Sequence, residues 1–263
     1  MIKLFVTDLD GTLLKNHLYV EEENQEALQS LHRQGIDIAF ASGRTDQDIV
    51  QLFDELKISG HRLSQNGAFL IDKNKQLLSE NNFPHELSKE IYQVSKDLPV
   101  YYFVTTKDHT YFDQEIPIID QLQPLFNHRL VFNPELANDI KDGLQVSKVM
   151  LMAETEVLHV LKAELDNEFK QQINTFLSAP MCLDISPPGI NKAAGLQVLC
   201  DSLQINPHEI AVIGDSQNDI DMLKMTPHSY VMSSAEHDVK QVANHVVDYV
   251  YQAIDHLRTN NLL

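Results

Sequence analysis

The stretch KLFVTDLDGTLL, residues 3–14, joins an apolar run to two closely spaced acidic residues. The run predicts a buried strand over residues 2–7. Asp8 and Asp10 follow it, with one residue between them. Like charges this close repel each other, and burying them without a cation costs free energy. The stretch is therefore either a solvated turn or part of a site that holds a positive charge.

The chain as a whole is strongly acidic. Its 263 residues include 20 Lys and Arg against 38 Asp and Glu, which gives a formal charge of −18 at pH 7. Such a polyanion is poorly suited to nucleic acid or to an anionic membrane surface, and we expect neither partner. It also repels phosphorylated metabolites at long range. A site for such a substrate therefore needs a local positive centre.

Other features of the composition bear on compartment and on metal sites. Hydrophobic residues make up 43% of the chain, as in a globular protein. Cys182 and Cys200 match no metal-ligand spacing and are too few for a disulfide framework, so we expect reduced thiols. The 12 histidines show no ligand spacing and predict no zinc site. An early Asp argues against a secretory signal, and no apolar run approaches the roughly 18 residues of a membrane span. We therefore expect a cytoplasmic protein.

Strand and helix patterns alternate in the first third of the chain. The expected elements are a strand at 2–7, a helix at 22–34, a strand at 36–42, a helix at 45–58 and a short strand pair at 68–72 and 75–79. Gly35 is expected to end the first helix and Thr45 to cap the second. This alternation predicts a parallel sheet with helices on both faces.

The pattern changes near Pro84. From there the sequence predicts a helix at 85–97, a hairpin of strands at 100–106 and 110–112, a strand at 144–153, a helix at 154–169 and strands on either side of Pro180. The helix at 154–169 is expected to turn Val157, Leu158, Leu161 and Leu165 inward. We interpret this middle third as a separate α+β unit.

The α/β alternation returns after Pro187, Pro188 and Gly189. The expected elements are a helix at 191–203, a strand at 210–215, a helix at 218–224, a strand at 229–233, a helix at 236–243 and a last strand and helix. We therefore expect an α/β core domain at residues 1–82 and 187–263, interrupted by an inserted α+β domain at residues 83–186.

Polar residues follow several of the strands expected in the core. Because the carboxyl ends of parallel strands meet at one edge of a sheet, we expect these side chains to converge. They are Asp8 and Asp10 after the first strand, Ser42, Gly43 and Arg44 after the second, Asn66 and Gly67 in the next region, Asp215, Ser216, Gln217, Asn218 and Asp219 after residue 214, and Lys192 at a helix start. Four carboxylates at one edge favour a hard divalent cation, and Mg²⁺ prefers oxygen ligands.

Five motifs in this order resemble the haloacid dehalogenase (HAD) superfamily of phosphohydrolases. They are DLDGTLL (8–14), SGR (42–44), QNGA (65–68), GINKAAG (189–195) and GDSQNDIDML (214–223). The insertion between the second motif and the lysine resembles the Cof-type subfamily IIB, whose cap is of the C2B type. The resemblance covers nearly the whole chain. It implies a Rossmann-like parallel-sheet core with an inserted cap that sets substrate specificity.

The resemblance implies catalytic and phosphate-binding roles for the matching residues. Asp8 would be the nucleophile that forms an aspartyl-phosphate, and Asp10 would be the general acid–base. The spacing suits both roles, because residues i and i+2 at a strand end face the same way. Ser42 and Gly43 would donate hydrogen bonds to the phosphoryl group. Lys192 would neutralise phosphoryl oxygens and keep the nucleophile ionised.

The resemblance also implies a Mg²⁺ site. Its ligands would be the carboxylates of Asp8 and Asp215 and the main-chain carbonyl of Asp10. Asn218 would contact the nucleophile or the substrate, and Asp219 would orient the ligands from behind.

Three points stay open in the sequence. Arg44 either reaches the substrate or pairs with a nearby carboxylate. Asn66 and Gly67 either form only a turn with positive φ or also line the cavity. A set of aromatic residues either forms a stacking wall for a ring or packs within a sheet: Tyr101, Tyr102, Phe103 and Tyr111.

The predicted activity is Mg²⁺-dependent hydrolysis of a small phosphomonoester. By resemblance, the substrate is a sugar phosphate, pyridoxal phosphate or an FMN-like ester, and the phosphate passes through Asp8. Two alternatives are a phosphomutase on the same fold and a non-catalytic phospho-accepting signalling protein. The second is the weaker, because receiver domains carry no cap insert. We expect the partner to be a small phosphorylated metabolite and the protein to be a monomer, since a capped chain can close its own site.

Overall fold

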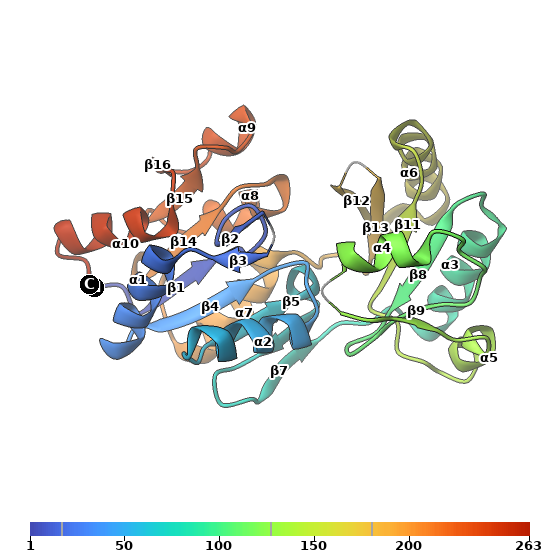
Figure 1. Cartoon of the computed structure of the whole chain (residues 1–263), viewed down its shortest axis with the longest axis horizontal. Helices are drawn as coiled ribbons and strands as arrows, with labels where there is room; N and C mark the ends of the chain where they lie inside the picture. Colours follow the sequence, from blue (N-terminus) through green and yellow to red (C-terminus); the bar gives the residue numbers. More distant parts are fainter. Residues whose placement is uncertain (17, 127, 180) are drawn as a thin grey trace. The chain divides into compact units, whose positions relative to one another are not determined.

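The computed structural model describes residues 1–16, 18–126, 128–179 and 181–263. These divide into two compact units (Figure 1). The larger comprises Met1–Glu80 and Asn191–Leu263, and the smaller comprises Asn81–Ile190. Both boundaries lie within a few residues of those expected from the sequence.

The larger unit contains an eight-stranded sheet in the order β16-β15-β14-β1-β4-β5-β6-β7. Its strands are β1 (Leu4–Thr7), β4 (Asp37–Ala41), β5 (His61–Ser64), β6 (Phe69–Ile71), β7 (Leu77–Glu80), β14 (Ile210–Gly214), β15 (Ser229–Met232) and β16 (His245–Val247). The strands from β16 to β5 are parallel, whereas β6 and β7 pair antiparallel. A small hairpin, β2 (Leu14–Lys15) with β3 (Tyr19–Val20), follows β1. The predicted parallel sheet is confirmed.

Helices cover both faces of this sheet, as predicted (Figure 1). On one face, Phe5 of β1 packs in a core with the apolar sides of α1 (Glu22–Arg33), α2 (Asp46–Leu56) and α10 (Val250–Thr259). On the other face, Leu4 and Val6 pack with α7 (Lys192–Leu203), α8 (Ile220–Leu223) and α9 (His237–Lys240). Neighbouring residues of β1 therefore serve opposite cores, which is why the whole strand is apolar and buried.

Local signals set the ends of the first two helices. Thr45 caps α2, and it forms a capping box with Asp48: the main-chain N–H of each residue donates to the side chain of the other. α1 ends before Gly35, whose φ is +79°. The predicted cap and stop are both confirmed. Strand β5 was not predicted, because three of its four buried side chains are polar.

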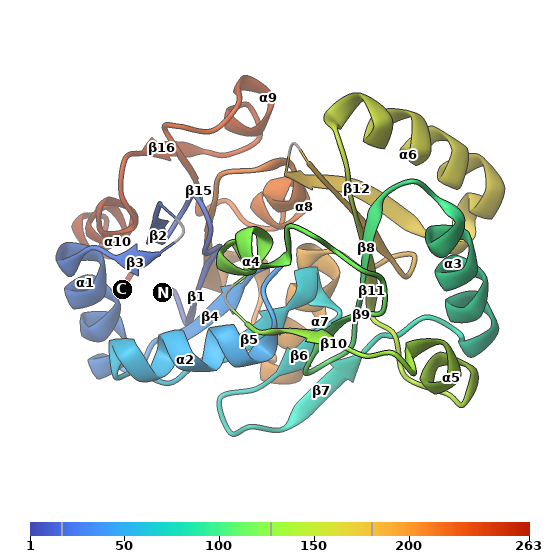
Figure 2. The same cartoon turned by 45° about the vertical axis from the view of Figure 1, so that its right-hand side comes forward.

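The smaller unit contains a six-stranded sheet in the order β10-β9-β8-β11-β13-β12. Its strands are β8 (Tyr101–Thr105), β9 (Thr110–Phe112), β10 (Leu130–Phe132), β11 (Lys148–Met152), β12 (Asn174–Ala179) and β13 (Cys182–Ser186). The helices α3 (His85–Asp97), α5 (Leu136–Lys141) and α6 (Thr155–Phe169) pack on one face, and α4 (Ile119–Leu122) packs on the other (Figure 2). Pro180, which the sequence placed between two strands, lies outside the described residues.

In the smaller unit, one expectation about a side chain is wrong and one alternative that the sequence left open is decided. Val157 was predicted to face inward, but it is 39% exposed, because the buried stripe of α6 runs through Leu158, Leu161 and Leu165. The aromatic residues of β8 and β9 do not form one stacking wall. Tyr102 packs toward α3 and Phe103 packs on the opposite face, since successive strand residues alternate.

The chain contains two cysteines, Cys182 and Cys200. Both thiols are free, with Cys200 buried and Cys182 half-buried. Among the described residues, no helix has the length and apolar character that a membrane crossing requires.

The turn after β5 fits closely against the start of α7. A Cβ added to Gly67, whose φ is +92°, would lie 2.6 Å from the carbonyl oxygen of Asn191. A Cβ on Gly195 would lie 3.1 Å from the Cα of Gly67. Asn191 in turn caps α7, because its Oδ1 accepts from the Ala194 N–H at 2.7 Å. Gly67 and Gly195 thus allow α7, which begins with Lys192, to pack closely against this turn.

Gly67→Ala should destabilise the larger unit more than an ordinary glycine substitution. Gly35→Ala is the matched control, because it has a similar positive φ with nothing within 4 Å of the added methyl. The control should cost about 1–2 kcal/mol of unfolding free energy. Gly67→Ala should cost about 1–3 kcal/mol more, because its methyl also meets Asn191. Urea unfolding measures both values, and equal losses would contradict the proposed fit.

Candidate active site

Three neighbouring strands deliver polar residues to one edge of the larger sheet. Asp8 follows β1, Ser42 follows β4, and Asp215 follows β14. The strand β1 lies between the other two, and all three are parallel. The ladder extends one step past the strands: the Asp8 N–H donates to the Ile213 carbonyl at 3.0 Å and the Ser42 N–H to the Leu63 carbonyl at 2.9 Å. Asp8 and Ser42 are therefore still fixed by sheet geometry.

Lys192 lies at the centre of this edge and is only 1% exposed. Its Nζ donates to Oδ1 of Asp8 at 2.6 Å and to Oδ1 of Asp219 at 2.7 Å. Burial alone lowers the pKa of this ammonium, but the two carboxylates outweigh that effect and raise its pKa above the ordinary value. Lys192 is therefore a charged lysine that is held from two sides.

Three carboxylates surround this lysine. Oxygens of Asp8, Asp215 and Asp219 lie within 4.8 Å of one another. Burial raises the pKa of Asp8 well above its usual value; Lys192 opposes this, and the neighbouring carboxylates add to it. Burial and Asp219 likewise raise the pKa of Asp215. One ammonium against three carboxylates leaves two negative charges uncompensated when all are ionised, and these all-oxygen donors suit Mg²⁺.

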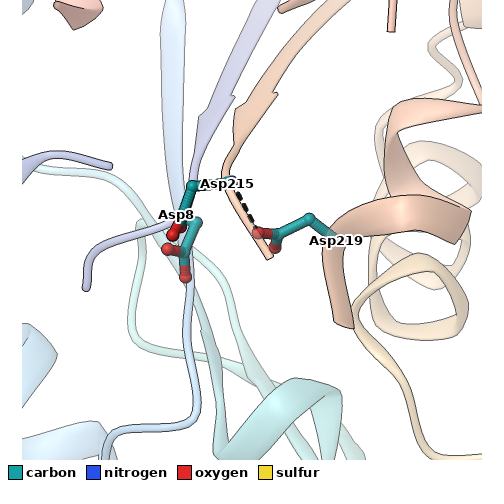
Figure 3. A group of neighbouring side chains, drawn as sticks. All are labelled: Asp8, Asp215 and Asp219. Carbon is teal, nitrogen blue, oxygen red and sulfur yellow. Dashed lines mark hydrogen bonds between the residues drawn. The ribbon is translucent and has the colours of Figure 1, made fainter. Parts of the chain in front are cut away.

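Asp219 uses both of its oxygens within the protein. Its Oδ1 accepts from Lys192, and its Oδ2 accepts from the main-chain N–H of Ser216 at 3.0 Å. The same Oδ2 accepts from the main-chain N–H of Asp215 at 2.9 Å, which is the dashed line in Figure 3. A Cβ on Gly214 would lie 2.5 Å from the Asp219 carboxyl carbon. Figure 3 shows Asp219 reaching back to this main chain, while the carboxylates of Asp8 and Asp215 point toward one another. Asp219 is thus tied to its own loop and to Lys192.

The turn after Asp8 holds Asp215 in place. The Thr12 hydroxyl donates to Oδ1 of Asp215 at 2.8 Å. A Cβ on Gly11, whose φ is +86°, would lie 2.4 Å from Oδ2 of Asp215. This bond was not predicted from the sequence. The hydroxyl directly after the glycine was the only available signal, because its partner is 203 residues away.

The carboxylate of Asp10 lies against a cation of its own, Arg44. It forms an ion pair with Arg44, in which Nε lies 2.7 Å from Oδ2 and Nη2 lies 2.5 Å from Oδ1. The Arg44 side chain is 13% exposed. This bidentate pairing is the carboxylate partnership that the sequence offered as one of two roles for Arg44.

The loop after β4 and the loop after β14 are joined by Asn66. Ser42 is 1% exposed, and its Oγ accepts from the Arg44 N–H at 3.2 Å. Asn218 donates from Nδ2 to Oδ1 of Asn66 at 3.2 Å. Asn66 has a φ of +58°, as expected for a turn, and its side chain also lies between the two loops. Gly43 lies directly beside this amide.

Comparison with known proteins places the chain among hydrolases. Residues 5–253 match the sequence profile of the haloacid dehalogenase-like hydrolases. The HMP-PP phosphatase of Cronobacter sakazakii is 29% identical over 89% of this chain and 85% of its own length. A solved haloacid dehalogenase-like hydrolase from Bacteroides thetaiotaomicron has a TM-score of 0.87 and 28% identity, covering 98% and 100% of the two chains. TM0651 from Thermotoga maritima has a TM-score of 0.89 and 26% identity, covering 97% of each chain.

Removal of the central ammonium should destabilise the fold in a pH-dependent way. Lys192→Met leaves three clustered carboxylates, so the pKa of Asp8 should rise further above its unfolded value. A carboxyl with a raised folded pKa loses stability as the pH rises above the unfolded pKa. At pH 7.5 without divalent cations, we expect a loss of about 3–5 kcal/mol of unfolding free energy, and a smaller loss at pH 5.

Urea unfolding in EDTA at both pH values measures this effect. The control is Lys73→Met, which removes an exposed lysine paired with Asp37. It should cost less than about 1 kcal/mol at either pH. A loss for Lys192→Met that is the same at both pH values would contradict the role of clustered carboxylates.

Proposed function

The chain belongs to the haloacid dehalogenase-like hydrolase family, and from this premise we propose that it is a Mg²⁺-dependent phosphatase of small phosphomonoesters. The observation that carries the proposal is the buried Lys192, which donates to Asp8 and Asp219 beside a third carboxylate, Asp215. This arrangement sets the Asp8 carboxylate against the Lys192 ammonium, and Mg²⁺ bound at Asp8 and Asp215 would add the local positive centre that the cluster itself lacks. In a chain with a formal charge of −18, an anionic substrate requires such a centre.

We propose hydrolysis in two steps. In the first, a carboxylate oxygen of Asp8 attacks phosphorus, the bond to the leaving oxygen breaks, and the carboxyl of Asp10 gives that oxygen its proton. In the second, Asp10 takes a proton from a water molecule, which attacks phosphorus and releases phosphate from Asp8. Splitting the reaction in this way is ordinary covalent catalysis. Arg44 would orient Asp10 in its ionised form, in which Asp10 acts as the base of the second step.

The other residues at this edge of the sheet would bind Mg²⁺ and the phosphoryl group. Mg²⁺, held by the carboxylates of Asp8 and Asp215 and the main-chain carbonyl of Asp10, would neutralise charge on the phosphoryl oxygens. Ser42 and Gly43 would donate hydrogen bonds to the phosphoryl group, and Lys192 would keep the nucleophile ionised.

The side chains of Asn218 and Asp219 would complete the site. Asn218 would contact the nucleophile or the substrate from the loop after β14. Asp219 would fix that loop and Lys192, since both of its oxygens are already engaged.

Phosphate release from acetyl phosphate, an acyl phosphate, and from a panel of phosphate esters tests the proposal. The wild type should hydrolyse acetyl phosphate and several sugar phosphates with Mg²⁺ but not with EDTA. Asp8→Asn should reduce kcat at least about 1,000-fold, because it removes the attacking carboxylate. Asp221→Asn is the control: this residue is exposed on α8, and its activity should match the wild type. Full activity of Asp8→Asn would refute the mechanism.

We further propose that residues 83–186 act as the cap that sets specificity. One polar cluster in the smaller unit has unused hydrogen-bonding capacity. Oδ1 of Asp184 and Oγ of Ser186 are buried, and neither has a partner among the described residues. Lys148 lies 3.3 Å from the other oxygen of Asp184. Because buried polar atoms normally have a partner, this cluster is our candidate for binding substrate hydroxyls.

Substitutions in this cluster should change specificity rather than chemistry. Ser186→Ala and Asp184→Asn should lower kcat/KM for sugar phosphates about 10-fold, as expected for one lost hydrogen bond to a charged or hydroxyl group. The leaving group of acetyl phosphate is acetate, which has no hydroxyl to bind. The kcat/KM for acetyl phosphate should therefore stay within about twofold of the wild-type value. Ser95→Ala is the control, since this buried hydroxyl on α3 also has no partner among the described residues. Equal losses with both substrates would contradict a specificity role.

The other expectations stay predictions. These are a monomeric protein, a cytoplasmic location and a small phosphorylated metabolite as the substrate. The Cronobacter relative, which is named a phosphatase, supports the last of them.

A further inference from the structure

The turn after β5 contains three consecutive residues with a left-handed backbone. The φ angles are +49° at Gln65, +58° at Asn66 and +92° at Gly67. Glycine adopts such angles readily, but other residues do so at a cost in free energy. Gln65 and Asn66 are also buried, at 3% and 6% exposure. Strained backbone of this kind concentrates at functional sites.

Two main-chain hydrogen bonds hold the turn in this conformation. The Gln65 N–H donates to the Arg44 carbonyl, and the Asn66 N–H donates to the Ser42 carbonyl, both at 2.8 Å. The turn is therefore attached to the loop that carries Ser42 and Gly43. Because both bonds use the main chain, the position of Asn66 relative to that loop does not depend on its own side chain.

The Asn66 amide is fixed on one side and unused on the other. Its Oδ1 accepts from Asn218 Nδ2 at 3.2 Å, and Asn218 Oδ1 accepts from the Ser216 hydroxyl at 2.7 Å. The Asn66 Nδ2 lies 3.5 Å from the position of a Cβ on Gly43. Within the described chain, neither this Nδ2 nor the Gly43 N–H donates a hydrogen bond. Two unused donors therefore lie together beside Ser42.

We propose that Asn66 binds the transferring phosphoryl group. Its Nδ2 donates to a phosphoryl oxygen in the same cradle as the Ser42 hydroxyl and the Gly43 N–H. This inference rests on the proposed phosphatase function. A donor that the fold holds in place before the substrate arrives is effective at a developing charge, because it needs little reorganisation. The left-handed backbone is the feature that aims the amide.

The competing role for Asn66 is only to hold Asn218 in place. The substitution Asn66→Asp separates the two roles, because a carboxylate of the same size still accepts from Asn218 but cannot donate to phosphate. Asn66→Gly removes the amide and tolerates the positive φ. Asn261→Gly is the control, since Asn261 is an exposed asparagine with a φ of +54°.

Calorimetric binding of orthophosphate to each protein in Mg²⁺ tests the proposal without turnover. Loss of one hydrogen bond to a charged group should raise the Kd about 10-fold in Asn66→Gly. Added charge repulsion should raise it about 100-fold in Asn66→Asp. The Asn261→Gly value should stay within about twofold of the wild type. The kcat/KM for acetyl phosphate should fall in the same order.

The results separate this inference from the proposed function. Wild-type affinity for orthophosphate in Asn66→Asp would overturn the inference, and so would a wild type that binds no orthophosphate. If the wild type hydrolyses esters but the Asn66 variants bind orthophosphate normally, only the inference fails. If the wild type hydrolyses no ester but the affinities follow the expected order, only the phosphatase function fails. If Asn66→Asp does not fold, the Kd of Asn66→Gly for orthophosphate is compared with that of Asn261→Gly. Equal values would then overturn the inference.

Discussion

The buried ammonium of Lys192 is the interaction on which the larger unit depends. It contacts Asp8 at the end of β1 and Asp219 after β14, and it is almost fully removed from water. A buried charge is tolerable only when its partners are held in place. Residues 184 positions apart must therefore meet within hydrogen-bonding distance. The parallel sheet provides this, because it ends neighbouring strands at one edge and seats α7 beside them.

Glycines explain how so many polar groups fit at that edge. Gly11 allows the first turn to approach Asp215, and Gly214 allows Asp219 to fold back on its own loop. At both positions a methyl group would lie within 2.5 Å of a carboxylate atom. The site is thus a packed network whose geometry is set before any ligand binds. Such preorganisation is what phosphoryl transfer requires, because its catalysis is mostly positioning and charge stabilisation.

Helices and strands with a clear apolar periodicity could be predicted from the sequence. Elements whose buried side chains are mostly polar could not. The helix at 85–97 was predicted with the bounds that α3 has, because its apolar periodicity is clear. Strand β5 was missed, since its polar side chains are buried by partners that only the fold brings together. In the same way, spacing identified the acidic residues of the site, but it gave no indication that Thr12 bonds to Asp215. It offered a carboxylate partner for Arg44 only as one of two roles and did not say that the partner is Asp10.

The sequence by itself determined the fold class, the family and the set of polar residues at the strand ends. These follow from local periodicity and from motif order, which the chain carries in consecutive residues. Only the tertiary structure decided which partner each side chain takes, such as Arg44 with Asp10 and Asn66 with Asn218. The physical reason is that hydrogen bonds and ion pairs depend on distances of a few ångströms between distant segments. Those distances are set by how strands, turns and helices pack together.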